Sequence, residues 1–183
     1  MPPTDDAPAY TAKDSETRSA EAGGASAVFG RTITIAKPAD KLYAWWRDFS
    51  NLPKVMENIV EIVVLDERRS RWTVKGPTGA YEWIARVTAD EPGRLIAWEA
   101  EDGADVKNAG RVEFRPAAPP ERGTWVTAVI GYDPPGGIIG KAVAKLTQRE
   151  PAIQQRRDLK RLKMLMETGE IATATPPNPA PAS

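Results

Sequence analysis

The chain has 183 residues, and its 25 basic side chains balance its 25 acidic ones. This length suits one domain with tails and is too short for two ordinary domains. The balanced charge gives no indication of nucleic acid as a partner. Because the sequence contains no cysteine and no histidine, it excludes disulfides, thiolate nucleophiles, Ser-His triads and the usual zinc sites. We therefore expect neither a metal nor a cofactor.

The two ends of the chain differ in composition from its middle. Residues 1–28 and 171–183 are dominated by Pro, Ala, Ser and other side chains that offer little apolar surface to bury, so both are predicted to be disordered tails. The first tail lacks the basic start and apolar stretch of a signal peptide, which predicts a cytoplasmic protein. A single domain is expected over residues 29–170.

The domain is predicted to begin with a strand that leads into a helix. In residues 31–36, Ile33 and Ile35 share one face, as in a half-buried strand. A helix is expected from about Pro38. Its bulky apolar residues recur at helical spacing and are Leu42, Trp45, Trp46 and Phe49. A break at residues 51–53 precedes a second, shorter helical turn, so two short helices should follow the first strand.

Six further segments rich in β-branched and aromatic residues follow the helices. They cover residues 59–65, 71–76, 81–88, 94–99, 109–115 and 124–132. Their connections are short enough for antiparallel neighbours. In the strand over residues 81–88, alternation places Tyr81 and Trp83 on one face and Glu82 and Arg86 on the other.

A long helix is predicted from residue 138 to a cap at Gly169. Pro151 should either kink it or stand in the first turn of a new helix. Its apolar stripe is expected to comprise Ile138, Ile139, Ala142, Val143, Leu146, Ile153, Leu159, Leu162 and Met166. Its other side is basic, through Lys141, Lys145, Arg149, Arg156, Arg157, Lys160, Arg161 and Lys163. That side is either a solvated surface or a weak contact for an anionic membrane.

Several segments, in this order, resemble the SRPBCC superfamily with its START-like or helix-grip fold. They are RTITIAKPAD, YAWWRDFSNLPKVM, RWTVKGPTGAYEW, IAWEAEDGADVKNAGRVEF and YDPPGG with the long helix after it. Within the superfamily, bacterial polyketide cyclase/dehydrase-like and coenzyme Q-binding proteins are the most similar. The resemblance implies an α+β fold of the START or Bet v type, in which a curved antiparallel sheet of about seven strands surrounds a long C-terminal helix. It also implies an elongated cavity capped by the two short helices.

A broad apolar cavity wall would suit a lipid, a quinone or a polyketide-like molecule. The residues predicted to bind this hydrophobic ligand are Trp72, Val74, Trp83, Trp98, Phe114, Met56, Leu52 and Leu146. An alternative is that the tryptophans simply fill the core. No feature of the sequence indicates an oligomeric state.

Two functions agree with these patterns. The first is a non-catalytic carrier or sensor of a hydrophobic small molecule, which the absence of histidine and cysteine favours. The second is an aromatase/cyclase-like enzyme that acts on a polyketide-type substrate, largely by positioning it. Its polar groups would come from Arg71, Tyr81, Glu82 and Arg86. Since Glu82 and Arg86 lie opposite Trp83 on their strand, an inward Trp83 favours the carrier, whereas an inward Glu82 and Arg86 favour the enzyme.

Overall fold

The computed structural model describes residues 27–76, 79–133 and 149–172. The two predicted tails lie outside these ranges except for residues 27–28 and 171–172. The predicted beginning of the long helix, with Leu146, also lies outside them. Within the described ranges, no helix combines the length and the apolar character that a bilayer crossing requires.

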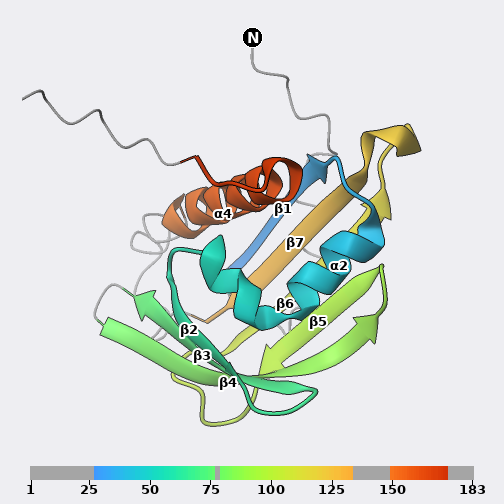
Figure 1. The fold of residues 1–183 in the computed structure, drawn as a ribbon. Coiled ribbons are helices and arrows are strands. Elements are labelled where there is room, and N and C mark those ends of the chain that lie inside the picture. Colours follow the sequence, from blue (N-terminus) through green and yellow to red (C-terminus); the bar gives the residue numbers. More distant parts are fainter. Residues whose placement is uncertain (1–26, 77–78, 134–148, 173–183) are drawn as a thin grey trace, which may run out of the picture.

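In the described residues, seven strands form one antiparallel sheet in the order β1-β7-β6-β5-β4-β3-β2. The strands are β1 (Ala27–Ile35), β2 (Ile59–Val64), β3 (Arg69–Gly76), β4 (Gly79–Glu91), β5 (Leu95–Ala100), β6 (Asn108–Pro116) and β7 (Thr124–Tyr132). The sheet curls, so that it has a concave and a convex face (Figure 1). The predicted helix-grip architecture, with its seven-stranded sheet, is confirmed.

Alternation along the paired strands decides which side chains reach the concave face. Ile33 pairs with Val126 and Ile35 with Thr124, and all four are buried. Thr32 and Thr127 point the other way, and their hydroxyl groups hydrogen-bond on the convex face at 2.9 Å. The apolar core therefore lies inside the curve of the sheet.

The two short helices predicted after the first strand are α2 (Ala39–Arg47) and the 3-10 helix η1 (Phe49–Lys54). Asp48 separates them, and its carboxylate accepts a hydrogen bond from the Ser50 backbone N–H at 3.2 Å, which caps η1. The apolar face of this pair is buried against the sheet through Leu42, Trp46, Phe49 and Leu52, while Trp45 is half-buried beside it. The predicted packing face is thus confirmed.

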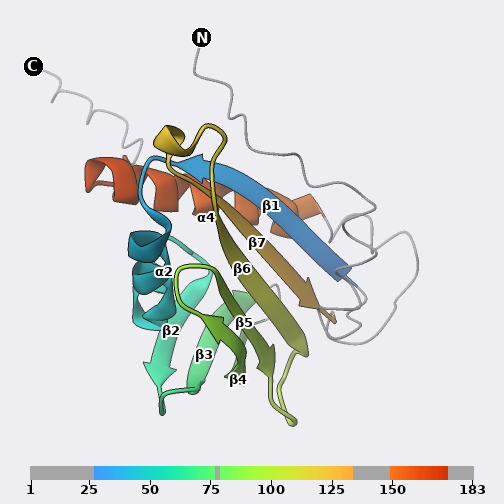
Figure 2. The ribbon, with the colours of Figure 1, turned by 90° about the vertical axis from the view of Figure 1, so that its right-hand side faces the viewer.

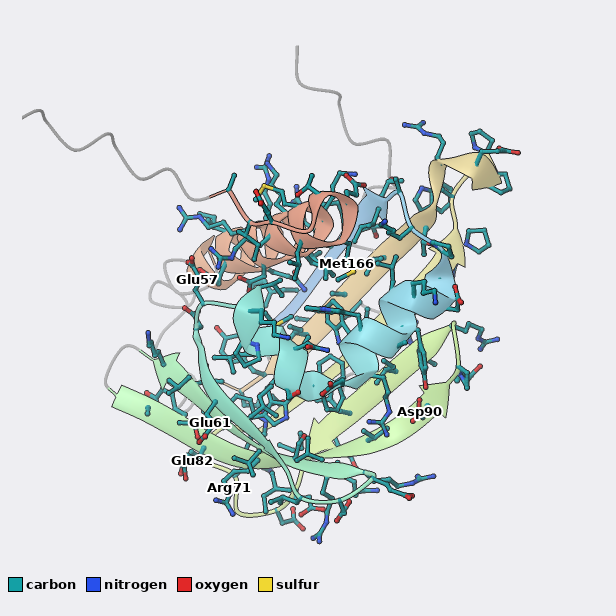
Figure 3. The ribbon with its side chains drawn as sticks, viewed as in Figure 1. Glu57, Glu61, Arg71, Glu82, Asp90 and Met166 are labelled. Atoms are coloured by element: carbon teal, nitrogen blue, oxygen red, sulfur yellow. The ribbon has the colours of Figure 1, made fainter. Side chains whose placement is uncertain are left out.

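Helix α2 is held to the end of β4 through Asp90 (Figure 3). The Tyr43 hydroxyl donates to this carboxylate, and Arg47 Nε lies 2.7 Å from it. Burial, followed by the hydrogen bond to Asp90, raises the pKa of Tyr43 to about 12. Tyr43 therefore remains a neutral donor at ordinary pH, and the link to β4 persists.

Helix α4 (Arg149–Thr168) lies on the concave side together with α2 (Figure 2). Near its end, Lys163 Nζ donates to the Thr34 carbonyl at 2.5 Å. Nearer its beginning, Gln155 Nε2 donates to the Ala128 carbonyl at 3.1 Å. Ala128 pairs with Arg31 at the middle of β1. From Gln155 to Lys163, helix α4 consequently runs from the middle of the β1–β7 pair toward the Ile35 end of β1.

The end of α4 agrees with the predicted cap, but its inner face does not agree with the predicted stripe. Gly169, with φ of +81°, donates its N–H to the Leu165 carbonyl at 2.9 Å. Leu159 and Leu162 are buried as predicted, whereas Ile153 is 43% exposed. The inward positions one turn earlier are polar instead, because the buried side of the helix passes through Gln155 and Asp158.

Gly123 follows the short 3-10 helix η2 (Pro120–Arg122) and is expected to be intolerant of a side chain. Its φ is +104°, and a Cβ atom there would lie 2.2 Å from the Ile35 carbonyl oxygen of β1. A Gly123→Ala substitution should therefore lower the free energy of unfolding by about 2 kcal/mol, which urea denaturation would measure.

Gly103→Ala is the matched control for this substitution. Gly103 has a φ of +88° but open space where its Cβ would be. It should report the backbone strain alone, so the excess loss at Gly123 measures the close approach of β1. Equal losses at the two positions would contradict that close approach.

Candidate functional site

Three tryptophans from adjacent strands form a stacked layer on the concave face. Trp72 of β3 pairs with Trp83 of β4, and their ring centroids lie 6.0 Å apart with an interplanar angle of 21°. Trp98 of β5 stacks on the other side of Trp72, at 6.2 Å and 18°. Trp83 therefore faces inward. This is the orientation predicted for a carrier.

One half of the concave face is closed by its own side chains. The Phe49 ring of η1 contacts Trp72 at 5.6 Å and Trp98 at 6.1 Å between centroids. Each of these two tryptophans is only 5% exposed. Gly110 leaves room for the Trp98 ring, since a Cβ atom there would lie 2.4 Å from it. Among the predicted ligand contacts, Phe114 and Leu52 are also buried in this closed half.

The other end of the concave face is only half-buried. Ala85 pairs with Ala100, and Asn108 with Tyr132, which places Trp83 and Tyr132 toward the same end of the sheet. Further half-buried side chains on this end are Phe29, Met56, Ile59, Val74, Tyr81 and Ile130. Phe29 and Tyr132 stack at 5.8 Å. This end, which we call the aromatic end, has apolar surface that its own strands do not cover completely.

The Trp83 indole contributes a polar atom to the aromatic end. Its Nε1 is buried and has no hydrogen-bond partner among the described residues. By contrast, Trp72 Nε1 donates to the Ser70 hydroxyl at 2.8 Å. The Nε1 atoms of Trp46 and Trp125 are likewise buried without a partner among the described residues, so this feature is not specific to the aromatic end.

Helix α4 turns buried polar groups toward the sheet. Gln155 Nε2 donates to the Ala128 carbonyl at the middle of β7, and the helix runs from there toward Thr34, to whose carbonyl Lys163 donates. Asp158, one turn further along α4, is 9% exposed. Its Oδ1 accepts a hydrogen bond from Gln154 Nε2 at 2.8 Å. The inner side of α4 therefore carries a buried amide and a buried carboxyl group.

The surroundings of Asp158 favour its neutral form. Burial, the largest effect, raises its pKa from 3.8 to about 7, and the Glu57 carboxylate acts in the same direction. The hydrogen bond from Gln154 and the charge of Arg161 oppose this rise. Arg161 itself is paired with Glu57, which lies beside α4 (Figure 3). Near neutral pH, Asp158 can thus either donate or accept a proton.

Sequence reasoning missed Gln155 and Asp158. Their signal was the spacing of Gln155, Asp158, Leu159 and Leu162 at i, i+3, i+4 and i+7, which is one helix face. A search for apolar residues alone included Ile153 in the stripe and passed over the two polar positions. Buried polar groups within an otherwise apolar helix face are the sites that such a search loses.

The predicted catalytic residues are not brought together. Arg71, Glu82 and Arg86 lie on the convex face and are exposed, and Arg71 and Glu82 are seen at the outside of the sheet in Figure 3. Glu82 accepts a hydrogen bond from Thr73 at 3.1 Å, and Arg86 pairs with Glu99. Tyr81 alone shares the face of Trp83. The described residues contain no cluster of three acidic groups that could hold a metal ion.

A separate open cleft of ≈ 400 Å³ lies between the short helices and the turn that joins β2 to β3. Its rim is charged, through Arg47, Asp48, Asp66, Glu67, Arg68 and Arg69. Its apolar lining includes Phe49 and Val87. Because Phe49 packs on Trp72 and Trp98, this cleft ends at the closed half and does not reach the aromatic end.

Comparison with known proteins places the fold and the site in one family. The sequence pattern of the polyketide cyclase/dehydrase and lipid transport family matches residues 35–160, which include β2 to β7 and the Asp158 position. The chain belongs to this family. The resemblance to START-like proteins of the polyketide cyclase type is therefore confirmed. No curated protein matches the chain.

Solved structures share the fold of this chain. A protein from Deinococcus radiodurans is 43% identical, with a TM-score of 0.64 over 78% of this chain and 99% of that one. A START superfamily protein from Mycobacterium smegmatis shares the fold at 17% identity, with a TM-score of 0.55 over 73% of this chain and 98% of that one. The di-domain ARO/CYC BexL does so at 18% identity and a TM-score of 0.51, over 74% of this chain and 47% of that one.

The basic side of the long helix is smaller than its sequence indicates. Arg156, Arg157 and Lys160 are exposed on α4. Arg161 pairs with Glu57, and Lys163 pairs with Glu167 and binds the Thr34 carbonyl. Lys141 and Lys145 lie outside the described residues. Contact with an anionic membrane through this side stays a prediction.

Proposed function

We propose that this family member binds a hydrophobic small molecule, such as a lipid, a quinone or a polyketide-like compound, at the aromatic end and acts as a carrier or sensor. The observation that carries the proposal is the inward position of Trp83, stacked on Trp72 and only half-buried. A flat or extended apolar guest would complete the burial of this ring and its neighbours. The family description, which includes lipid transport, supports the same class of guest.

The closed half explains why such a site is stable without its guest. Phe49, Trp72 and Trp98 fill their part of the concave face by contacts with one another. These contacts would therefore hold the sheet and the short helices together whether or not a guest is bound. Of the predicted ligand contacts that lie within the described residues, this leaves Trp83, Val74 and Met56 as those with surface available to a guest.

An aromatase/cyclase-like enzyme is the second candidate, and Asp158 is the observation that favours it. A carboxyl group with a pKa near 7 is suited to general acid or base catalysis. Turnover of a poly-ketone substrate that Asp158→Asn abolishes would support the enzyme. Unchanged turnover in this variant would exclude the role of Asp158.

The carrier proposal can be tested by the binding of N-phenyl-1-naphthylamine. This apolar dye becomes fluorescent in an apolar environment. The wild-type protein should bind it, and Trp83→Leu should weaken binding by about tenfold, since loss of an aromatic contact of roughly 1.4 kcal/mol has that effect. Trp125→Leu is the matched control, because Trp125 lies on the convex face, opposite to its neighbour Val126 in β7.

The control variant should bind the dye as the wild type does. Equal weakening by both substitutions, or no binding to the folded wild type, would contradict the proposed site. Native mass spectrometry of the purified protein provides an independent measurement, in which a co-purified apolar molecule should be lost from Trp83→Leu and retained by Trp125→Leu.

A further inference from the structure

We propose that the free edge of β2 pairs with β2 of a second copy of this chain, in an antiparallel arrangement centred on Val63, so that the two sheets join into one. Strand β2 is the last in the sheet order and has β3 on one side only. It lies at the outer margin of the sheet in both ribbon views (Figure 1 and Figure 2). A strand in this position presents N–H and C=O groups that its own sheet does not bind.

The side chains along this edge are apolar and exposed, which is the first argument. Within the described ranges, the exposed large apolar side chains are Val60, Val63, Val64, Leu65 and Ile153. The first four belong to β2 or follow it directly, and they are 52%, 38%, 57% and 38% exposed. Ile153 stands apart from them on α4. Apolar side chains gathered along an unpaired strand indicate a surface that another strand covers.

The opposite edge of the sheet is already occupied, which is the second argument. Strand β1 forms that edge, and side chains of α4 bind backbone groups at its end. Lys163 Nζ donates to the Thr34 carbonyl at 2.5 Å, and the Ala36 N–H donates to the Glu167 carboxylate at 2.8 Å. Among the described residues, no side chain binds the backbone of β2 in this way. The β2 edge is therefore the one that remains available for a further strand.

The hydrogen bonds between β2 and β3 decide which groups point outward. The Leu65 N–H donates to the Arg69 carbonyl at 2.9 Å, and the backbone groups of an antiparallel strand point alternately toward and away from their partner. Ile62 and Val64 therefore direct their N–H and C=O groups away from β3. A two-fold axis at Val63 places Ile62 of each copy opposite Val64 of the other. Each of these pairs can then exchange both of its hydrogen bonds.

The regular part of β2 is symmetric about the same residue. A bulge between Ile59 and Glu61 interrupts the pairing with β3, and the turn to β3 begins after Leu65, so Val63 is the middle of the regular stretch. Val63 pairs with Arg71 and lies on the convex face. In the dimer, the two Val63 side chains would meet in a pair without hydrogen bonds, where opposed side chains approach most closely.

The charges of the segment favour a second copy as the occupant. Glu61 is the one charged residue from Ile59 to Leu65, and the antiparallel arrangement places it opposite Leu65 of the other copy. Leu65 is bonded to Arg69, which in turn pairs with Arg86. Each Glu61 carboxylate would thus approach a basic part of the other convex face. A parallel arrangement would instead place the two carboxylates side by side, which is unfavourable.

A charge exchange at Val63 tests the proposal by sedimentation equilibrium. The wild type should form a dimer, and Val63→Lys should weaken it by about tenfold, because two lysines would face each other across the two-fold axis. Val63→Glu should have a similar effect, and mixing the two variants should restore the association. Ile153→Lys is the matched control, since it replaces an exposed apolar side chain on α4 and should leave the dimer unchanged.

Cysteine substitution tests the register, because the chain has no cysteine of its own. Val63→Cys should form a disulfide between two copies under mild oxidation, since the Cα atoms of such a pair lie about 4.5 Å apart. Glu61→Cys is the control on the same strand and face. Its equivalent in the other copy would lie roughly 13 Å away, four residues along an extended strand. A non-reducing gel separates the two results.

Three outcomes would overturn the proposal. A wild type that remains monomeric up to high micromolar concentrations would exclude the second copy and point to an extended segment of another protein as the partner. A dimer that Val63→Lys leaves intact would show that the copies associate through another surface. Equal crosslinking of Glu61→Cys and Val63→Cys would exclude the register. Circular dichroism establishes that each variant is folded, and the cysteine pair decides the matter if Val63→Lys is not.

Discussion

Replacing Asp158 by Asn is expected to remove a pH dependence of stability worth about 4 kcal/mol, because a shift of roughly three pKa units corresponds to that free energy. The pKa of Asp158 rises from 3.8 to about 7 on folding, chiefly through burial. Below the unfolded value, the carboxyl group is protonated in both states. As the pH rises further, the unfolded chain releases the proton while the folded protein retains it, so stability falls until the pH passes about 7.

Urea unfolding of both proteins at a series of pH values measures this effect. The difference in unfolding free energy between wild type and Asp158→Asn should change across the window from about pH 4 to pH 7 and be constant above it. Asp90→Asn is the control. Burial acts to raise the pKa of Asp90, but hydrogen bonds from Tyr43 and Arg47 outweigh it and the net shift is downward. Its contribution should therefore change only below about pH 4. A constant difference for Asp158→Asn would show that Asp158 is ionised in the folded state.

Truncation of Trp98 to Ala is expected to lower the free energy of unfolding by about 4 kcal/mol. The Trp98 ring contacts Phe49 and Trp72 and fits the space left by Gly110. Removing it would leave a cavity in the closed half that its rigid surroundings cannot fill. Denaturant unfolding measures this loss of stability. Titration with the dye N-phenyl-1-naphthylamine in the absence of denaturant measures ligand binding by the same variant.

Trp83→Ala is the comparison for this second prediction, because Trp83 belongs to the same stacked layer but is only half-buried. It should cost distinctly less stability and more affinity for the dye. The two variants would then distinguish the closed half, which stabilises the fold, from the aromatic end, which binds the guest. If Trp83→Ala destabilised the protein as much as Trp98→Ala, the division of the concave face into a closed half and an aromatic end would be wrong.

The order of elements was readable from the sequence because it depends on local patterns. Alternation along β4 placed Tyr81 and Trp83 on one face, and the structure pairs them with Val74 and Trp72 of β3. The spacing of Leu42, Trp46 and Phe49 likewise predicted the face of the short helices that packs. These patterns repeat every two or 3.6 residues, so a short window contains them.

The degree of burial of each side chain could not be predicted from such local patterns. Trp72, Trp83 and Trp98 have the same pattern, yet Phe49 closes over Trp72 and Trp98 and leaves Trp83 half-buried. That difference arises from an element more than twenty positions away in the chain. Asp158 was missed for a related reason, since its burial is decided by the loop containing Glu57 and by the sheet, and a polar residue shows no hydropathy signal.

The pairing of the first strand with the last has a consequence for how the chain reaches this fold. Ile35 of β1 pairs with Thr124 of β7, roughly 90 positions later, so closing the sheet requires a long loop to be ordered first. Contacts so distant in sequence slow folding. During synthesis, β1 must wait for β7 with its apolar residues uncovered, and this is the interval in which the chain is most exposed to aggregation.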